Sequence, residues 1–143
     1  MIDITPQTRK EKLVLLHEKH AQIPVILNET GLDCWMIFVR ETSLTPDSTM
    51  DLVVGNDVVL ASAFIFGFIN EKYTKTALVA NFDADTELNK HIWDQVVAYE
   101  KSFKAQLIDL LSSYNPKHIA LNFCKDDPSA DGLTHGMFLY LQE

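Results

Sequence analysis

Residues near the start of the chain recur at steps of three and four, which is the spacing of one face of an α-helix. The residues on this face are Leu13, Leu16, His20, Ile23 and Leu27. Thr5 is a plausible N-cap and Pro6 suits the first helical position. The pattern therefore predicts a helix from residue 6, kinked or split at Pro24 and ended by Gly31.

A second helical pattern covers residues 103–114. Its apolar side chains fall on one face, and they are Phe103, Leu107, Leu110 and Leu111. Ser102 is the expected N-cap, and Asn115-Pro116 is expected to end the helix.

Between and after these helices, continuous apolar runs predict buried strands at residues 34–40, 61–68, 75–82 and 118–123, with a short strand at 96–100. We expect 61–68 and 75–82 to form an antiparallel hairpin with a longer loop over 69–74. Alternation places Phe64, Phe66 and Phe68 on one sheet face. Trp35 and Trp93 are interpreted as packing residues of the core.

Residues 41–57 predict a loop around Pro46 that leads into a short helical turn, ended by Gly55 and Asn56. The closing residues predict the start of a final helix. Together the elements alternate in a way that is typical of an α/β fold, with a mixed sheet of about five to six strands flanked by helices. Because no linker or repeat divides the sequence, we expect residues 1–143 to form a single domain.

Composition narrows the possible partners. The 20 acidic and 12 basic residues give a formal net charge of −8, which argues against nucleic acid. The longest apolar run is too short to cross a bilayer as a helix, and the first residues lack the apolar stretch of a signal peptide. We therefore expect a cytoplasmic protein with no membrane partner. Cys34 and Cys124 are interpreted as buried free thiols.

Candidate chemistry is concentrated at the end of the chain, where Asp126, Asp127, Asp131 and His135 occur within ten residues. Asp131 and His135 are four residues apart, so on a helix they could share a cation. Alternatively, Asp131 is a helix-capping carboxylate, His135 is its neighbour one turn into the helix, and the other two belong to a turn before Pro128. The second interpretation is favoured, so no metal site is predicted. The other histidines, His17, His20, His91 and His118, are expected at the surface or half buried.

Arg40 and Glu41 follow the predicted central strand at its carboxyl end, which is where open α/β sheets place their ligands. They are the candidate substrate-facing residues. The alternative is a strand end exposed to solvent. The sequence lacks a glycine-rich phosphate loop, a G-x-S-x-G elbow and an H-E-x-x-H helix, so no catalytic residue is predicted.

Several segments resemble the amino-terminal domain of the creatinase/prolidase group, the Xaa-Pro peptidases with a pita-bread catalytic domain. They are "TGLDCWMIFVRE", "KHIALNF" and above all "DDPSADGLTHGMFLYL", in which the block from Asp131 to Met137 is typical of one bacterial branch. The resemblance covers nearly the whole chain. It implies a ribonuclease-H-like mixed sheet and a separate catalytic domain that this chain does not contain.

In such proteins the catalytic domain holds two divalent ions, Mn, Co or Zn, through two Asp, a His and two Glu. The resemblance matches none of Asp126, Asp127, Asp131 and His135 to those ligands. It implies a non-catalytic domain, without a cofactor of its own, that contacts its catalytic domain, contributes to a homodimer and forms a wall that restricts access to the active site of an Xaa-Pro aminopeptidase or dipeptidase.

Two other functions remain open from the residues. A free-standing module could bind peptides or small molecules at the sheet edge near Arg40. A ribonuclease-H-like nuclease is disfavoured, because residues 34–40 contain no carboxylate to hold catalytic metal ions and the net charge repels the substrate.

Overall fold

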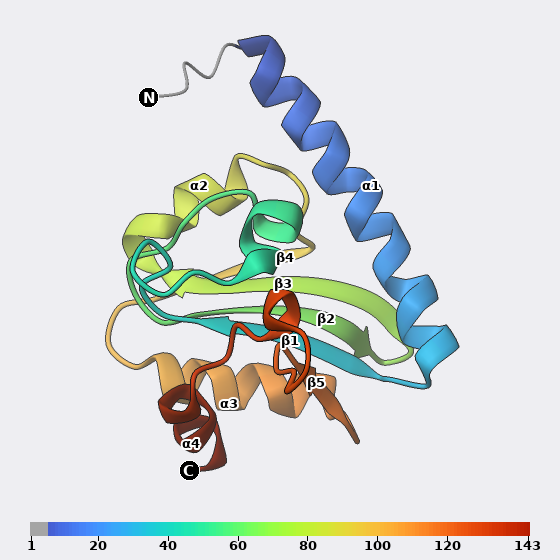
Figure 1. The fold of residues 1–143 in the computed structure, drawn as a ribbon, viewed down its shortest axis with the longest axis vertical. Helices are drawn as coiled ribbons and strands as arrows, with labels where there is room; N and C mark the ends of the chain where they lie inside the picture. Colours follow the sequence, from blue (N-terminus) through green and yellow to red (C-terminus); the bar gives the residue numbers. More distant parts are fainter. Residues whose placement is uncertain (1–5) are drawn as a thin grey trace.

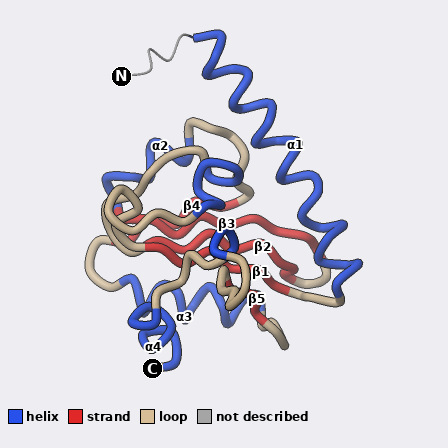
Figure 2. The backbone as a smooth tube through the Cα atoms, in the orientation of Figure 1, coloured by secondary structure: helices blue, strands red, loops and turns tan. Residues whose placement is uncertain are grey.

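A computed structural model describes residues 6–143 as a five-stranded mixed sheet with helices on both faces (Figures 1 and 2). The strand order is β4-β3-β2-β1-β5. The strands are β1 (Cys34–Val39), β2 (Ser62–Ile69), β3 (Lys72–Ala80), β4 (Gln95–Tyr99) and β5 (Ile119–Leu121). The sheet confirms the predicted α/β architecture.

Strand direction determines which residues meet at each edge of the sheet. β2 is antiparallel to both β1 and β3, whereas β4 is parallel to β3 and β5 is parallel to β1. Four of the five strands therefore run in the same direction, and their carboxyl ends lie at one edge.

The two faces of the sheet bury separate apolar clusters. On one face, α1 (Pro6–Thr30) and α2 (Ala84–Leu88) cover a cluster that contains Ile37, Phe64 and Phe66, with Phe68, Trp35 and Trp93 packed against it. On the other, α3 (Phe103–Tyr114) and α4 (His135–Gln142) cover Met36, Phe38 and Ile65. The predicted shared face of the three phenylalanines and the packing of both tryptophans are confirmed.

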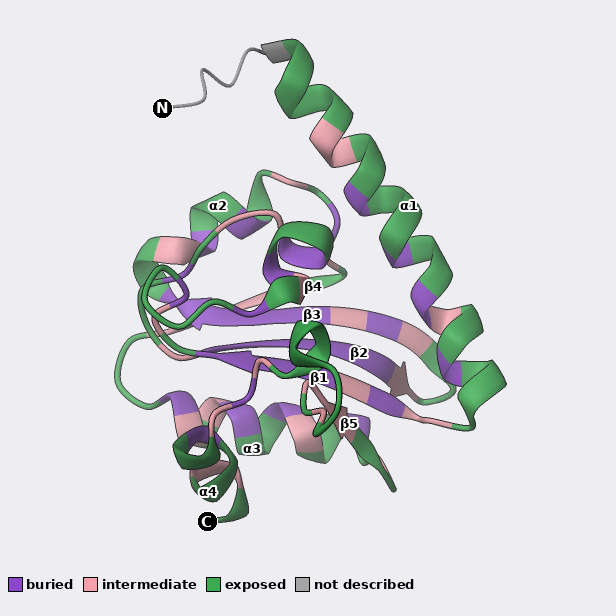
Figure 3. Ribbon diagram, viewed as in Figure 1, coloured by how far each residue is buried: buried purple, intermediate pink, exposed green. Residues whose placement is uncertain are grey.

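α1 is a single helix with Pro24 inside it, so a split at Pro24 is wrong. Leu16, His20, Ile23 and Leu27 are buried along one face, as the spacing predicted. The amino-terminal half extends past the sheet and is largely exposed (Figure 3). Gly31 has a left-handed φ of 68° and ends the helix as predicted, while the Thr5 cap lies outside the described residues.

The other predicted helical segments are also present. α3 begins after Ser102, whose side chain accepts a hydrogen bond from the Ala105 N–H at 3.2 Å. It ends at Asn115, which adopts the left-handed conformation with φ of 45°. The turn before Gly55 is a short π-helix, η1 (Met50–Val54), and Gly55 has φ of 92°.

Two local predictions were wrong, and one short helix was not predicted. The β2–β3 connection is a two-residue turn at Asn70-Glu71 with φ of 50° and 66°, a conformation usually adopted by glycine, so no signal in the sequence indicated so short a turn. β5 is a three-residue edge strand and Ile119 is 37% exposed, so residues 118–123 are not a buried strand. α2 was missed because "ADTEL" is short and lacks apolar periodicity.

Edge strand β5 is attached to β1 by side-chain hydrogen bonds as well as by the sheet ladder. The Asp33 carboxylate, just before β1, accepts the Lys117 N–H at 2.6 Å and the His118 N–H at 2.9 Å. The Lys117 bond contributes most to lowering the pKa of Asp33. This carboxylate therefore fixes the start of β5 beside the start of β1.

Candidate functional site

The carboxyl edge of the sheet contains the two predicted substrate-facing residues. Arg40 directly follows β1 and is exposed, and the half-buried Glu41 accepts a hydrogen bond from the Ser43 hydroxyl at 2.6 Å. The structure thus puts both residues at the expected edge. Their role toward a substrate stays a prediction.

A second carboxyl group lies near Glu41 at this edge. Asp83 follows β3 at the start of α2, and its Oδ2 is buried without a hydrogen-bond partner. Burial raises the pKa of Asp83, and the negative charges of Glu87 and Glu41 add to the effect, while a backbone hydrogen bond from Val59 opposes it. The edge therefore offers a carboxyl group that retains its proton more readily than an ordinary aspartate.

The acidic cluster at the end of the chain is used within its own loop. Asp127 accepts hydrogen bonds from the Ser129 hydroxyl and N–H at 2.6 and 2.9 Å, which cap the 3-10 turn η3 (Pro128–Ala130) and lower the pKa of Asp127. Asp131 accepts the Cys124 N–H at 3.3 Å, and Asp126 is exposed. Within residues 6–143, no group of three or more His, Cys, Asp and Glu side chains is arranged to hold a metal ion.

The predicted N-cap at Asp131 is wrong. α4 begins at His135, and Thr134 is its cap, with a side-chain oxygen that accepts the Met137 N–H at 3.3 Å. Thr134 has the extended backbone of an N-cap, whereas the Asp131 carboxylate accepts a hydrogen bond from Cys124 in the preceding loop. His135 is consequently the first residue of the helix rather than one turn inside it. The segment is nevertheless the entrance to a helix, as expected.

Sequence reasoning missed a polar network that connects four segments at the end of β5. The Asn122 side-chain amide donates to both carboxylate oxygens of the buried Asp47, at 3.1 and 3.0 Å, and accepts the Trp35 indole N–H at 2.8 Å. The backbone carbonyl of Asn122 accepts hydrogen bonds from the N–H groups of Gly132 and Leu133 at 3.1 and 2.8 Å. The network therefore fastens the closing segment to the sheet.

A second missed network lies beneath α2. Glu87 is fully buried, and its carboxylate accepts hydrogen bonds from the Lys90 ammonium at 2.9 and 3.0 Å and from the Trp93 indole at 2.7 Å. Lys90 also donates to the Val54 carbonyl at 2.7 Å and to Asn56. Burial lowers the pKa of Lys90, and the adjacent Glu87 opposes that shift. All of these contacts are made within the protein, so the network connects α2 with η1 and with Trp93.

His20 packs beside this network and corrects the expectation that it is exposed or half buried, since it is 2% exposed. Its Nε2 lies 2.7 Å from the Val53 carbonyl, which can only accept, so Nε2 carries the proton and Nδ1 is left without a partner. Its ring contacts Phe66 and Trp93 edge-on. Burial lowers the pKa of His20 to about 4, helped by the charges of Lys75, His17 and Lys90 and opposed by the Val53 bond.

The two cysteines are free, but only one is fully buried. Cys34 is inaccessible on β1, and burial raises the pKa of its thiol to about 12, which makes it unreactive. Cys124 is half buried, so the prediction of two buried thiols is confirmed for Cys34 alone.

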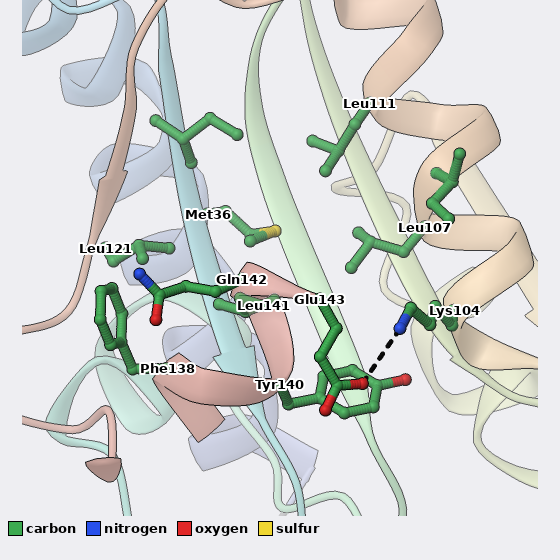
Figure 4. A pocket seen from close by; sticks show the side chains of 12 residues that line it. Met36, Lys104, Leu107, Leu111, Leu121, Phe138, Tyr140, Leu141, Gln142 and Glu143 are labelled. Carbon is green, nitrogen blue, oxygen red and sulfur yellow. Dashed lines mark hydrogen bonds and ion pairs between the residues drawn. The ribbon is translucent and has the colours of Figure 1, made fainter. Parts of the chain in front are cut away.

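An apolar groove of about 240 Å³ lies between α3, α4 and β5 (Figure 4). Leu107 and Leu111 line one side of it, and Leu121, Phe138 and Leu141 line the other. Lys104 and Glu143 form an exposed ion pair at its rim, with the Lys104 Nζ 3.1 Å from the carboxylate. The groove lies on the face of the sheet that α3 and α4 cover.

No protein-family model and no curated protein matches this chain. The residues that the structure describes include no helix long and apolar enough to cross a membrane.

Proposed function

We propose that this chain is a non-catalytic domain of the creatinase/prolidase type, which acts beside the metal-dependent catalytic domain of an Xaa-Pro aminopeptidase or dipeptidase. The observation that carries the proposal is the structural use of the segment with the strongest resemblance. Gly132 and Leu133 bond to Asn122, Thr134 caps α4, and Asp127 and Asp131 are used within the loop. These residues hold the loop and the start of α4 in place, which agrees with an assembly role better than with catalysis.

Exposed apolar side chains near α4 support a role in contacts with other domains. Phe123 is 71% exposed, Leu139 is 49% exposed and Phe138 is 40% exposed. The side of the groove that Leu121, Phe138 and Leu141 line in Figure 4 comes from the same part of the chain as these exposed residues. In this proposal the catalytic domain, which holds the two divalent ions, and a second protomer of a homodimer cover apolar surface of this kind.

Arg40 and Glu41 are proposed to face the active site of the catalytic domain from the sheet edge. An exposed guanidinium at the end of β1 is suited to bind the carboxylate of a short peptide. The wall formed by this edge would restrict longer substrates. The ribonuclease-H-like classification of the sheet belongs to the same proposal.

The first experiment assays the purified chain against Xaa-Pro dipeptides with added Mn²⁺ or Co²⁺. We expect no turnover, and turnover that remains with the pure protein would overturn the proposal. Saturable binding of short peptides by the chain alone, without any effect on a catalytic domain, would instead favour a free-standing binding module.

The second experiment supplies a catalytic domain of an Xaa-Pro peptidase of this group in trans and measures its preference for dipeptides over longer peptides. The chain should increase that preference, and Arg40→Ala with Glu41→Gln should reduce the effect. Lys10→Ala with Glu11→Gln, an exposed pair on α1, is the matched control and should leave the preference unchanged. Equal effects of both changes would refute the assignment of the sheet edge.

A further inference from the structure

A cleft of about 360 Å³ opens between the amino-terminal half of α1 and α2, on the opposite face of the sheet from the apolar groove. Arg9 and Lys12 line it from α1, one helical turn apart. Thr86 in α2 and Asn89 directly after it line the cleft from the other side, also three residues apart. Two cationic side chains thus share a cleft with a hydroxyl and an amide group.

The charge of the cleft is opposite to that of the whole chain. The sequence has 20 acidic and 12 basic residues, yet the cleft is lined by three basic residues and by no acidic one. The third cation, Lys90, is already bound to Glu87, Val54 and Asn56. Across residues 6–143, Arg9 and Lys12 form no hydrogen bond or ion pair, so their positive charges are free to bind an anion.

Two carboxylates near the cleft are already bonded to other groups. Glu87 is fully buried, and its oxygens are occupied by Lys90 and Trp93. Glu11, the acidic neighbour on α1, accepts a hydrogen bond from Gln7 at 2.8 Å. At 100° per residue, Glu11 lies about 160° around the helix from Arg9 and about 100° from Lys12, and it does not line the cleft. The cleft therefore retains a local excess of positive charge.

The rest of the lining is apolar. Leu13 and Leu16 belong to it, and Gly55 completes it in a left-handed conformation with φ of 92°. A Cβ at Gly55 would lie 2.8 Å from Leu16 Cδ1, so a side chain there would displace the leucine. Glycine at this position keeps the loop close to α1 and leaves an apolar surface beside the two cations.

We propose that this cleft binds a small phosphomonoester. Two free cations match the charge of a phosphate dianion, and arginine and lysine with hydroxyl and amide donors are the groups that bind phosphate oxygens. The apolar lining by Leu13 and Leu16 accommodates an organic group on the ester, and the volume lies within the range of small-ligand sites. This site is independent of the proposed role of the sheet edge.

The test follows amide chemical shifts of the full chain at low salt during titration with phenyl phosphate, inorganic phosphate and benzoate. We expect saturable shifts around residues 9–16, 55–56 and 86–90, with phenyl phosphate binding more tightly than either of the other two. Shifts that do not saturate, or that map elsewhere, would overturn the proposal. Tighter binding of benzoate would overturn the choice of phosphate.

Charge-matched variants separate a built site from general electrostatic attraction. Arg9→Gln and Lys12→Gln should each weaken phenyl phosphate binding on the order of tenfold. Lys10→Gln and Lys19→Gln each remove the same single charge from an exposed position of α1 outside the cleft, and each should change the affinity less than about twofold. Asn89→Asp places a carboxylate in the cleft and should abolish binding. Equal losses in the control pair would refute the site.

Discussion

Gly132 lies directly against the carboxylate of Asp47, although the two residues are far apart in the sequence. A methyl group on Gly132 would overlap that carboxylate and stand 3.0 Å from its Cβ. Asp47 cannot easily move away, because it is buried and accepts hydrogen bonds from Asn122 and from the Thr49 N–H at 2.8 Å. The closing segment therefore reaches the sheet only because residue 132 has no side chain.

Gly132→Ala is predicted to destabilise the protein. The added methyl group must displace the Asp47 carboxylate from its hydrogen bonds, and overpacking of this kind costs about 1–3 kcal/mol. Urea unfolding measures the change. Gly136→Ala is the matched control, since nothing lies within 4 Å of a Cβ there and the position is helical, so it should be neutral or stabilising by up to about 1 kcal/mol. A Gly132→Ala protein as stable as the control would contradict this packing.

The buried His20 is predicted to make the free energy of unfolding decrease as the pH falls below neutrality. Its pKa is about 4 in the folded protein against 6.5 for an ordinary histidine, so the unfolded chain takes up the proton first as pH falls. The stability that neutral His20 contributes is fully present above about pH 6.5 and is lost progressively toward pH 4. The lowered pKa of His20 corresponds to a loss of about 3 kcal/mol in the free energy of unfolding between those two pH values.

Urea unfolding across pH 4 to 7 checks the role of His20, with His20→Gln as the test and His17→Gln as the control on the same helix. We expect His20→Gln to flatten the pH dependence and His17→Gln, at an exposed position, to retain it. A His20 ring that titrates near pH 6.5 by NMR would show that it is not held neutral by burial.

The sequence predicts the parts of this fold that depend on local spacing. Apolar alternation placed Phe64 and Phe66 on one face, and the carboxyl end of β1 placed Arg40 and Glu41 at the sheet edge. Asn122 and Asp47 illustrate what spacing cannot predict, because they are 75 residues apart and meet only after β5 pairs with β1. Glu87 lies in a short polar segment, which gave no signal that tertiary packing would bury its carboxylate.

Glu87 and Lys90 are predicted to be strongly coupled in their effects on the free energy of unfolding. Lys90→Met leaves the buried Glu87 carboxylate with the Trp93 indole as its remaining described donor, and breaking a buried ion pair costs about 3–5 kcal/mol. Adding Glu87→Gln should recover at least about 1 kcal/mol of that loss, because the uncompensated charge is removed. Urea unfolding of the two single variants and the double variant measures the coupling.

The exposed pair Lys104–Glu143 is the control for this cycle. Both side chains are well exposed, so Lys104→Met should change the free energy of unfolding by less than about 1 kcal/mol. A Lys90→Met effect as small as that of Lys104→Met would mean that Glu87 is not held as a buried, paired carboxylate.

A substitution in the turn between β2 and β3 is predicted to stabilise the protein. Asn70 and Glu71 both have positive φ, 50° and 66°, in a two-residue hairpin turn, and glutamate is poorly suited to that conformation. The absence of glycine is the reason why the sequence indicated a longer loop. Glu71→Gly should relieve the backbone strain and raise the free energy of unfolding by about 0.5–1 kcal/mol. Lys72→Gly, one residue later in β3, should lower it by a similar amount, because glycine weakens a strand. Thermal and urea unfolding compare the two, and a destabilising Glu71→Gly would argue against this turn.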